Sequence, residues 1–147
     1  MKSYIALAFA SAAMLASSAA ALAEDAHPYD NGPVWDVSAI LTKPGHFEDY
    51  LKFVSTTWRA EQEAAKAQGL VLDYKVLVVT DPRENEPDLY LMVEYKNMGA
   101  FDVPLDEQDA VTKKIFGSLP AANKSGIDRE SIRTLKGDML TRELILK

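Results

Sequence analysis

The sequence predicts an α+β fold in which one antiparallel four-stranded sheet carries its helices on a single face. Apolar residues alternate with a period of two over residues 34–42, 70–79, 89–96 and 139–146, which predicts four strands. Residues 46–68 have apolar residues at a period of 3.6, and residues 105–116 form a second helical stretch. With 48% apolar and 26% charged residues in 147, the composition is that of a globular domain.

The first 23 residues have the pattern of a signal peptide. Lys2 is followed by an uncharged stretch over residues 4–22, and Ala21-Leu22-Ala23 forms a cleavage site before Glu24. The alternative is an N-terminal membrane anchor, because about 19 uncharged residues can just span a bilayer. The Ala- and Ser-rich second half and the cleavage site favour removal, and a lipid anchor would need a cysteine, which the chain lacks. We therefore expect cleavage after Ala23, a periplasmic or secreted location and no stable membrane anchor.

The mature chain divides into a flexible polar lead-in, residues 24–33, and a single domain, residues 34–147. In the first strand, Trp35, Val37, Ala39 and Leu41 share one face, which we expect to pack beneath the helices. The first helix presents an apolar stripe that includes Tyr50, Leu51, Val54 and Trp58, and Gly69 is expected to end it.

The second half of the domain continues with a hairpin, whose two strands are joined by the charged loop 81–87. Asn97 can cap a short turn that runs to Phe101, and Gly117 follows the helix at 105–116. We expect residues 120–126 to be a loop and residues 128–135 a short helix, with Gly137 as the break before the last strand. This order, β-α-β-β-α-(α)-β, is the split βαβ of a ferredoxin-like fold.

The second face of the sheet is too apolar for a surface in water. Val34 and Ile40 lie on it, and five residues are predicted to form a dimer interface there: Val71, Leu77, Val79, Tyr90 and Met92. A second copy of the chain would cover this face, so we expect a homodimer. The alternative is an ordinary exposed sheet with scattered apolar residues.

The order of elements, the apolar second face and the segment Tyr95-Lys96-Asn97-Met98-Gly99-Ala100-Phe101 together resemble the dimeric α/β-barrel superfamily. The resemblance covers residues 34–116 and implies two ferredoxin-like sheets paired face to face, as in exported bacterial members of unknown function. Many monooxygenase-type members carry a histidine shortly after the aromatic turn. Here that region reads Asp102-Val103-Pro104-Leu105-Asp106, so the resemblance does not imply their catalysis.

Charge and motifs exclude several classes of function. The net charge is −6, and no run of basic residues exceeds Lys113-Lys114, which argues against a nucleic-acid partner. The chain has no cysteine, no G-x-S-x-G motif and no glycine-rich phosphate loop. With two distant histidines, His27 and His46, we expect no metal site, no cofactor and no identifiable catalytic residue.

What remains is a set of aromatic residues that we expect between the helices and the sheet, where the resemblance also implies a ligand cavity. Together with His46, which opens the first helix beside Asp49, the predicted ligand-binding set is Trp35, His46, Tyr50, Trp58, Tyr74 and Tyr95. The same side chains would also suit a filled core. The expected function is non-catalytic binding of an apolar or aromatic small molecule by an exported homodimer. The alternatives are a cofactor-independent monooxygenase-like enzyme acting on a phenolic or apolar molecule, and a structural or partner-binding envelope protein.

Overall fold

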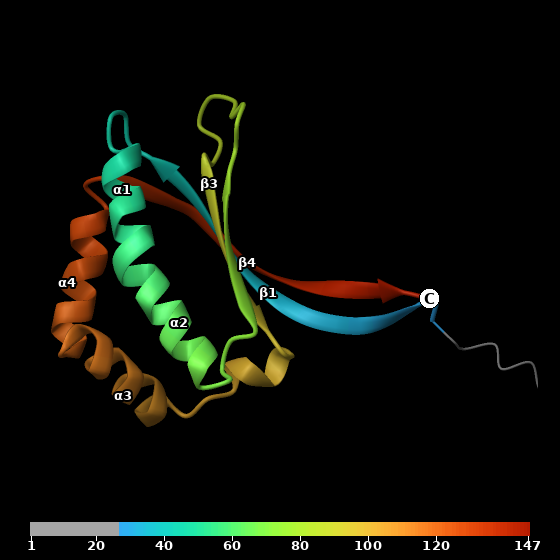
Figure 1. Cartoon of the computed structure of the whole chain (residues 1–147). Coiled ribbons are helices and arrows are strands. Elements are labelled where there is room, and N and C mark those ends of the chain that lie inside the picture. The colour runs from blue at the N-terminus through green and yellow to red at the C-terminus, as the bar shows by residue number, and fades with distance from the viewer. Residues whose placement is uncertain (1–26) are drawn as a thin grey trace, which may run out of the picture.

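The computed structural model describes residues 27–147, which form an antiparallel four-stranded sheet with the α-helices gathered on one side (Figure 1). In chain order the elements are β1 (Tyr29–Thr42), α1 (Phe47–Phe53), a π-helical segment (Val54–Trp58), α2 (Arg59–Ala67), β2 (Asp73–Val78), β3 (Leu89–Tyr95), a 3-10 turn (Met98–Phe101), α3 (Leu105–Phe116), α4 (Leu119–Arg129) and β4 (Arg133–Leu146). The strand order β2-β3-β1-β4 is that of a ferredoxin-like fold, as the sequence predicts. The predicted signal peptide and the first three residues of the lead-in lie outside the described residues.

The core lies where α1, the π-helical segment and α2 cross the sheet as one continuous helix, residues 47–67, which we call the long helix. Tyr50 and Val54 are buried against Ile40, Leu89 and Leu91. The half-buried side chains of Leu51 and Trp58 pack against this cluster, so the apolar stripe predicted for the first helix is confirmed. Gly69 has a φ of +72°, a conformation that glycine adopts without strain, and it follows the helix end as predicted.

The wider turn in the middle of this helix was not expected from the sequence. Two consecutive hydroxyl side chains bond to the same backbone carbonyl, because Ser55 Oγ and Thr56 Oγ1 lie 3.1 and 2.6 Å from the oxygen of Lys52. Such side chains compete with the helix's own hydrogen bonds, and a π-helical turn is one way a helix accommodates the competition. The turn places Val54 in the core and ends at Trp58.

β1 and β4 are both 14 residues long and form a ribbon that extends past the rest of the sheet. They pair from Tyr29 with Leu146 to Thr42 with Arg133, whereas the pairing with β3 reaches only to Val34. The segments 29–33 and 143–146 therefore form a two-stranded arm that projects from the domain, with the C-terminus at its tip (Figure 1). Residues 29–33 are thus strand, and their assignment to a flexible lead-in is wrong.

β4 also starts earlier than predicted, at Arg133 rather than at residue 139, and the helix expected at 128–135 is absent from this position. Gly137 does not break the strand. It pairs with Ala39, and the next pair is Ile40 with Leu135, so Lys136 is the extra residue of a β-bulge. A glycine inside a strand commonly marks such a bulge, because it lacks a side chain to obstruct the bend.

The segment expected as a loop at residues 120–126 is part of α4. Ser118 caps this helix, since its hydroxyl accepts a hydrogen bond from the backbone N–H of Ala121 at 3.2 Å. Pro120 begins the segment that the sequence analysis expects as a loop, but it occupies the first turn of α4, where a missing N–H costs no helical hydrogen bond.

The two faces of β1 are assigned the wrong way round in the sequence interpretation. Ser38 pairs with Leu91 and Ile40 with Leu89, so these residues face the helices together with Val34. Both faces of β1 carry large apolar side chains, and the helix-facing set includes the polar Asp36 and Ser38, which made that set resemble a solvent face. Ser38 Oγ donates to Asp138 on the neighbouring strand at 2.6 Å.

Candidate functional site

The six residues of the predicted ligand-binding set do not form one cluster. They are Trp35, His46, Tyr50, Trp58, Tyr74 and Tyr95. Trp35 lies on the sheet face away from the helices, as do its register neighbours, so its inclusion in a helix-side group is wrong. Tyr50 is 2% exposed in the filled core. The structure brings together Trp58 and Tyr74, while Tyr95 belongs to a separate hollow.

Trp58 and Tyr74 line a hollow of about 360 Å³ between the long helix and β2, which we call the edge groove. Their rings meet edge to face with centroids 5.4 Å apart. The hydroxyl of Tyr74 donates to the carboxylate of Glu63. Three charged residues, Glu48, Lys52 and Arg59, line the groove together with Trp58 and Tyr74. Because several charged residues reach it, the edge groove is a mixed polar and apolar surface feature.

A larger hollow, of about 650 Å³, lies between α2, α3, the 3-10 turn and the end of β3, and we call it the α3 pocket. Most of its lining is apolar or aromatic. The lining residues are Glu61, Gln62, Ala65, Leu70, Val71, Tyr95, Gly99, Ala100, Phe101, Val103, Glu107, Gln108, Val111 and Ile115. Among these, Tyr95 is the one member of the predicted ligand set.

The floor of the α3 pocket is built from short-range contacts. Asn97 Oδ1 accepts the N–H of Gly99 at 2.9 Å, which fixes the 3-10 turn and confirms the predicted cap. That turn brings Phe101 against Tyr95, with ring centroids 4.7 Å apart. Gln108 Nε2 donates to the carbonyl of Val103 at 2.7 Å and ties the start of α3 to the turn.

Glu61 on α2 is the polar group that distinguishes the α3 pocket. Its Oε1 atom is buried and has no hydrogen-bond partner among the described residues. Burial raises the pKa of this carboxyl above its ordinary value, and the positive charge of Arg129 opposes the rise in part. A buried oxygen without a partner leaves a site that a hydrogen-bond donor would satisfy.

Sequence reasoning missed Glu61, although a signal was present. It lies three residues after Trp58 and four before Ala65, on the apolar stripe of the first helix, and the sequence analysis assigns it no role. Phe101 and Val111 were also missed. Their shared location follows from the turn and from α3, which bring together residues far apart in the chain.

Buried positive charges lie between the long helix and α4. Arg133 is 8% exposed, and its Nη1 donates to Glu130 at 2.7 Å. Arg129 donates to Ser125 Oγ at 2.7 Å, and its guanidinium lies 4.4 Å from the centre of the Phe53 ring. Burial raises the pKa of the neighbouring Tyr50 hydroxyl, and the two arginines partly counter this rise. These groups support α4 on the long helix.

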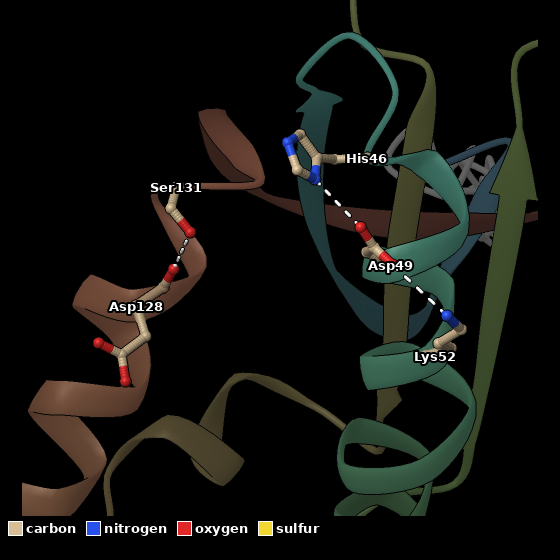
Figure 2. Close-up of polar contacts among 5 residues, drawn as sticks. All are labelled: His46, Asp49, Lys52, Asp128 and Ser131. Atoms are coloured by element: carbon tan, nitrogen blue, oxygen red, sulfur yellow. Dashed lines mark hydrogen bonds and ion pairs between the residues drawn. The ribbon is translucent and has the colours of Figure 1, made fainter.

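His46 opens α1 at the surface, where its Nδ1 lies 3.1 Å from Asp49 Oδ2 (Figure 2). Lys52 contacts the other oxygen of Asp49 at 3.5 Å, and hydrogen bonds from His46 and then Lys52 lower the pKa of this carboxyl. Figure 2 also shows Ser131, whose hydroxyl donates to the backbone oxygen of Asp128 at 2.6 Å. His46 lines neither the edge groove nor the α3 pocket, so it is not joined to the aromatic residues with which it was grouped.

The sheet face away from the helices has an apolar centre, which we call the open face. Its residues follow from the strand register: Trp35, Val37 and Ala39 from β1, Leu77 from β2, Tyr90 and Met92 from β3, and Met139 from β4. Leu77 and Met139 are about half exposed, at 48% and 47%. Lys75 lies over the Trp35 ring at 4.6 Å, and the indole N–H donates to Glu143 at 3.4 Å.

Four of the five residues predicted for a dimer interface agree with this face. Leu77, Tyr90 and Met92 lie on it, and Val79 continues the alternation just past β2. Val71 does not. It precedes β2, is 4% exposed and lines the α3 pocket on the helix side, so its assignment to the second face is wrong. The chain has left the strand alternation at this point, because β2 starts at Asp73.

Within residues 27–147, no three histidine, aspartate or glutamate side chains gather where they could hold a metal ion. No helix in this part of the chain is long and apolar enough to cross a membrane.

Comparisons with known proteins identify no family. No family model matches the sequence, and no curated protein matches it. Among solved structures, a protein from Shewanella oneidensis aligns with a TM-score of 0.49 at 11% identity, over 80% of this chain and 96% of its own. A dimeric ferredoxin-like protein from an uncultured marine organism aligns with a TM-score of 0.48 at 10% identity, over 80% of this chain and 90% of its own. A Pseudomonas aeruginosa protein gives 0.44 at 15% identity, over 79% and 96%.

Proposed function

We propose that this chain is an exported, homodimeric binding protein that holds an apolar small molecule in the α3 pocket without changing it chemically. The observation that carries the proposal is the pocket itself, a hollow of about 650 Å³ with a mainly apolar lining. Cavities that bind small molecules commonly measure about 300–1,000 Å³ and combine apolar walls with a few polar groups. Glu61, Gln62 and Gln108 supply those polar groups here.

The Tyr95–Phe101 pair favours a flat or aromatic ligand. Its tilted rings present a broad apolar surface at the pocket wall, and the half-buried Tyr95 adds a hydroxyl. Burial raises the pKa of this hydroxyl, with a smaller contribution from the charge of Asp36. Tyr95 therefore stays protonated at neutral pH and is able to donate a hydrogen bond.

A catalytic role has less support from the geometry. A cofactor-independent oxygenase needs a group beside the substrate that removes its proton. The residues considered for that role are His46 or a tyrosine. His46 sits at the surface and does not line the pocket. Tyr95 lines it, but burial raises the pKa of its hydroxyl, which makes it a poor proton acceptor at neutral pH. Binding alone requires no such group, and for this reason it is the function that we propose.

The homodimer is proposed on the open face and on the arm. Leu77 and Met139 are half exposed on the open face, and Ile145 and Leu146 are 52% and 78% exposed on the arm. An isolated two-stranded ribbon is marginally stable in water, so the arm needs a surface to lie on. A second copy that meets the open face leaves the α3 pocket free, because the pocket is on the helix side of the sheet.

The pocket is tested with the neutral fluorescent probe 1-naphthalenemethanol. We expect saturable binding, measured by calorimetry or probe fluorescence. The affinity should be at least 10-fold weaker in Val111→Trp, because the introduced indole ring fills part of the pocket. Ala110→Trp is the matched control, since Ala110 is the exposed neighbour on α3 and does not line the pocket. Absence of saturable binding, or equal loss in both variants, contradicts the proposed pocket.

Export is tested separately by N-terminal sequencing of the protein recovered outside the cytoplasm. We expect the mature chain to start at Glu24, because Ala21-Leu22-Ala23 forms the cleavage site. Recovered protein that still starts at Met1 would contradict cleavage.

A further inference from the structure

We propose that the α3 pocket selects a positively charged ligand, a hydrophobic amine with a flat apolar body. This inference rests on the proposed function, since it names the class of molecule that the same pocket takes. It is carried by the charges of the lining and by the aromatic pair Tyr95–Phe101.

The ionisable side chains of the lining, apart from Tyr95, are the carboxyl groups of Glu61 and Glu107, and no lysine or arginine of residues 27–147 lines the pocket. Glu61 lies on the α2 side and Glu107 on the α3 side, so the two acids face the hollow from different elements. The negative charge of Asp36 acts on Tyr95. The positive charge of Arg129 acts on Glu61, but this guanidinium bonds to Ser125, lies over Phe53 and is not part of the lining.

The acidic lining of the pocket would interact differently with an anionic, a neutral and a positively charged ligand. An anion would be repelled by the carboxylates of Glu61, which is half-buried, and Glu107, which is exposed. A neutral apolar molecule would fill the space but leave these two charges unbalanced. An ammonium group in the pocket would be attracted by both carboxylates and could form a charge-assisted hydrogen bond with one of them.

The aromatic pair Tyr95–Phe101 also favours a positively charged ligand. Tyr95 and Phe101 lie 4.7 Å apart between ring centroids and both line the pocket. A cation near the face of an aromatic ring is attracted by the ring's electron density, and this attraction grows when water is excluded. The apolar body of the ligand then fills the space between Val103, Val111 and Ile115.

The test compares three naphthalene probes of nearly equal size: 1-naphthylmethylamine, 1-naphthalenemethanol and 1-naphthoate, at pH 7 and low salt. We expect the amine to bind at least 10-fold more tightly than the alcohol, and the acid to bind more weakly than the alcohol. In Glu61→Gln the ratio of amine to alcohol affinity should fall clearly, while Glu107 and the aromatic pair retain part of the preference. Glu48→Gln is the matched control, because it removes the same charge from an exposed residue of the edge groove.

The outcomes separate this inference from the proposed function. If none of the three probes binds, the pocket and the proposed function both fail. If amine and alcohol bind equally, or if Glu61→Gln keeps the full preference, the pocket stands and the selection for a cation is wrong. If Glu48→Gln removes the preference instead, the amine binds in the edge groove, which also contradicts the inference.

Discussion

Glu61 places a carboxyl group in a position where burial opposes its charge. Because the pKa in the folded chain is raised, the folded state holds its proton to a higher pH than the unfolded state does. The free energy of unfolding should therefore fall as pH rises from about 4 through the folded-state pKa, and it should stay reduced at neutral pH. Below about pH 4 the carboxyl is protonated in both states and this contribution vanishes.

We expect Glu61→Gln to be more stable than the natural chain at pH 7 and equal to it near pH 4. The gain should be below about 1 kcal/mol, because the side chain is only partly buried and Arg129 offsets part of the cost. Chemical unfolding of both proteins at the two pH values measures the difference. Glu107→Gln, which changes an exposed residue of the same pocket, is the matched control; an equal response from both variants would refute a special role for Glu61.

His46 differs from Glu61 in that it has a hydrogen-bond partner but lies at the surface. Its contact with Asp49 joins two side chains that are 42% and 51% exposed. Exposed pairs of this kind add little to stability. We expect His46→Ala to leave the melting temperature almost unchanged and to remove no bound metal, as checked by thermal unfolding and elemental analysis. Stoichiometric metal that disappears in this variant would overturn the prediction.

At the scale of elements, Trp58 shows how the π-helical segment joins the helix to the sheet. Its ring packs edge to face on Tyr74 and against the core cluster. We expect Trp58→Ala to destabilise the fold by about 2–3 kcal/mol, somewhat less than the loss of a fully buried tryptophan, because the side chain is half buried. Urea unfolding measures the change, with Lys52→Ala as an exposed control on the same helix. A loss below about 1 kcal/mol would mean that the ring contributes little to the packing.

The element order and several element ends could be predicted because they depend on local chemistry. The cap at Asn97 and the glycines at 69 and 117 act within one turn of the chain, and the structure has each where expected. The faces of β1 could not be predicted in this way. Both of its alternating sets contain large apolar residues, and the choice between them is made by pairing with β3, whose partner residues lie 49 to 61 positions away in the sequence.

The candidate site was predictable only in part for the same reason. Tyr95 was identified because aromatic residues at a strand end are conspicuous, but the pocket also needs α3 and the 3-10 turn to bring Phe101 and Val111 beside it. Pro120 misled the prediction of the helix that follows. In the first turn of a capped helix proline is favourable, and only the cap at Ser118 distinguishes that position from a break.

At the scale of the whole molecule, one side of the sheet carries the helices and the other carries none of the described elements (Figure 1). The open face nevertheless has Val37 and Ala39 at its centre, flanked by Tyr90 and Met92 in register. The arm extends β1 and the edge strand β4 beyond the domain. Val37 and Ala39 are already buried within the chain, and two-fold pairing of open faces would cover the exposed Leu77 and Met139 in both copies, since such an interface uses the same patch on each partner.

We expect sedimentation at tens of micromolar to show a dimer, and Leu77→Asp or Met92→Lys to weaken it by about 100-fold. Each substitution appears twice at a two-fold contact, and placing like charges together there costs several kcal/mol. Asn85→Asp adds the same charge as Leu77→Asp but in the loop at 81–87, where Asn85 has a φ of +63° that aspartate also tolerates, so it should leave assembly unchanged. A natural chain that sediments as a monomer would rule out the dimer, and equal weakening by the loop control would show that net charge, rather than contact at the open face, governs association.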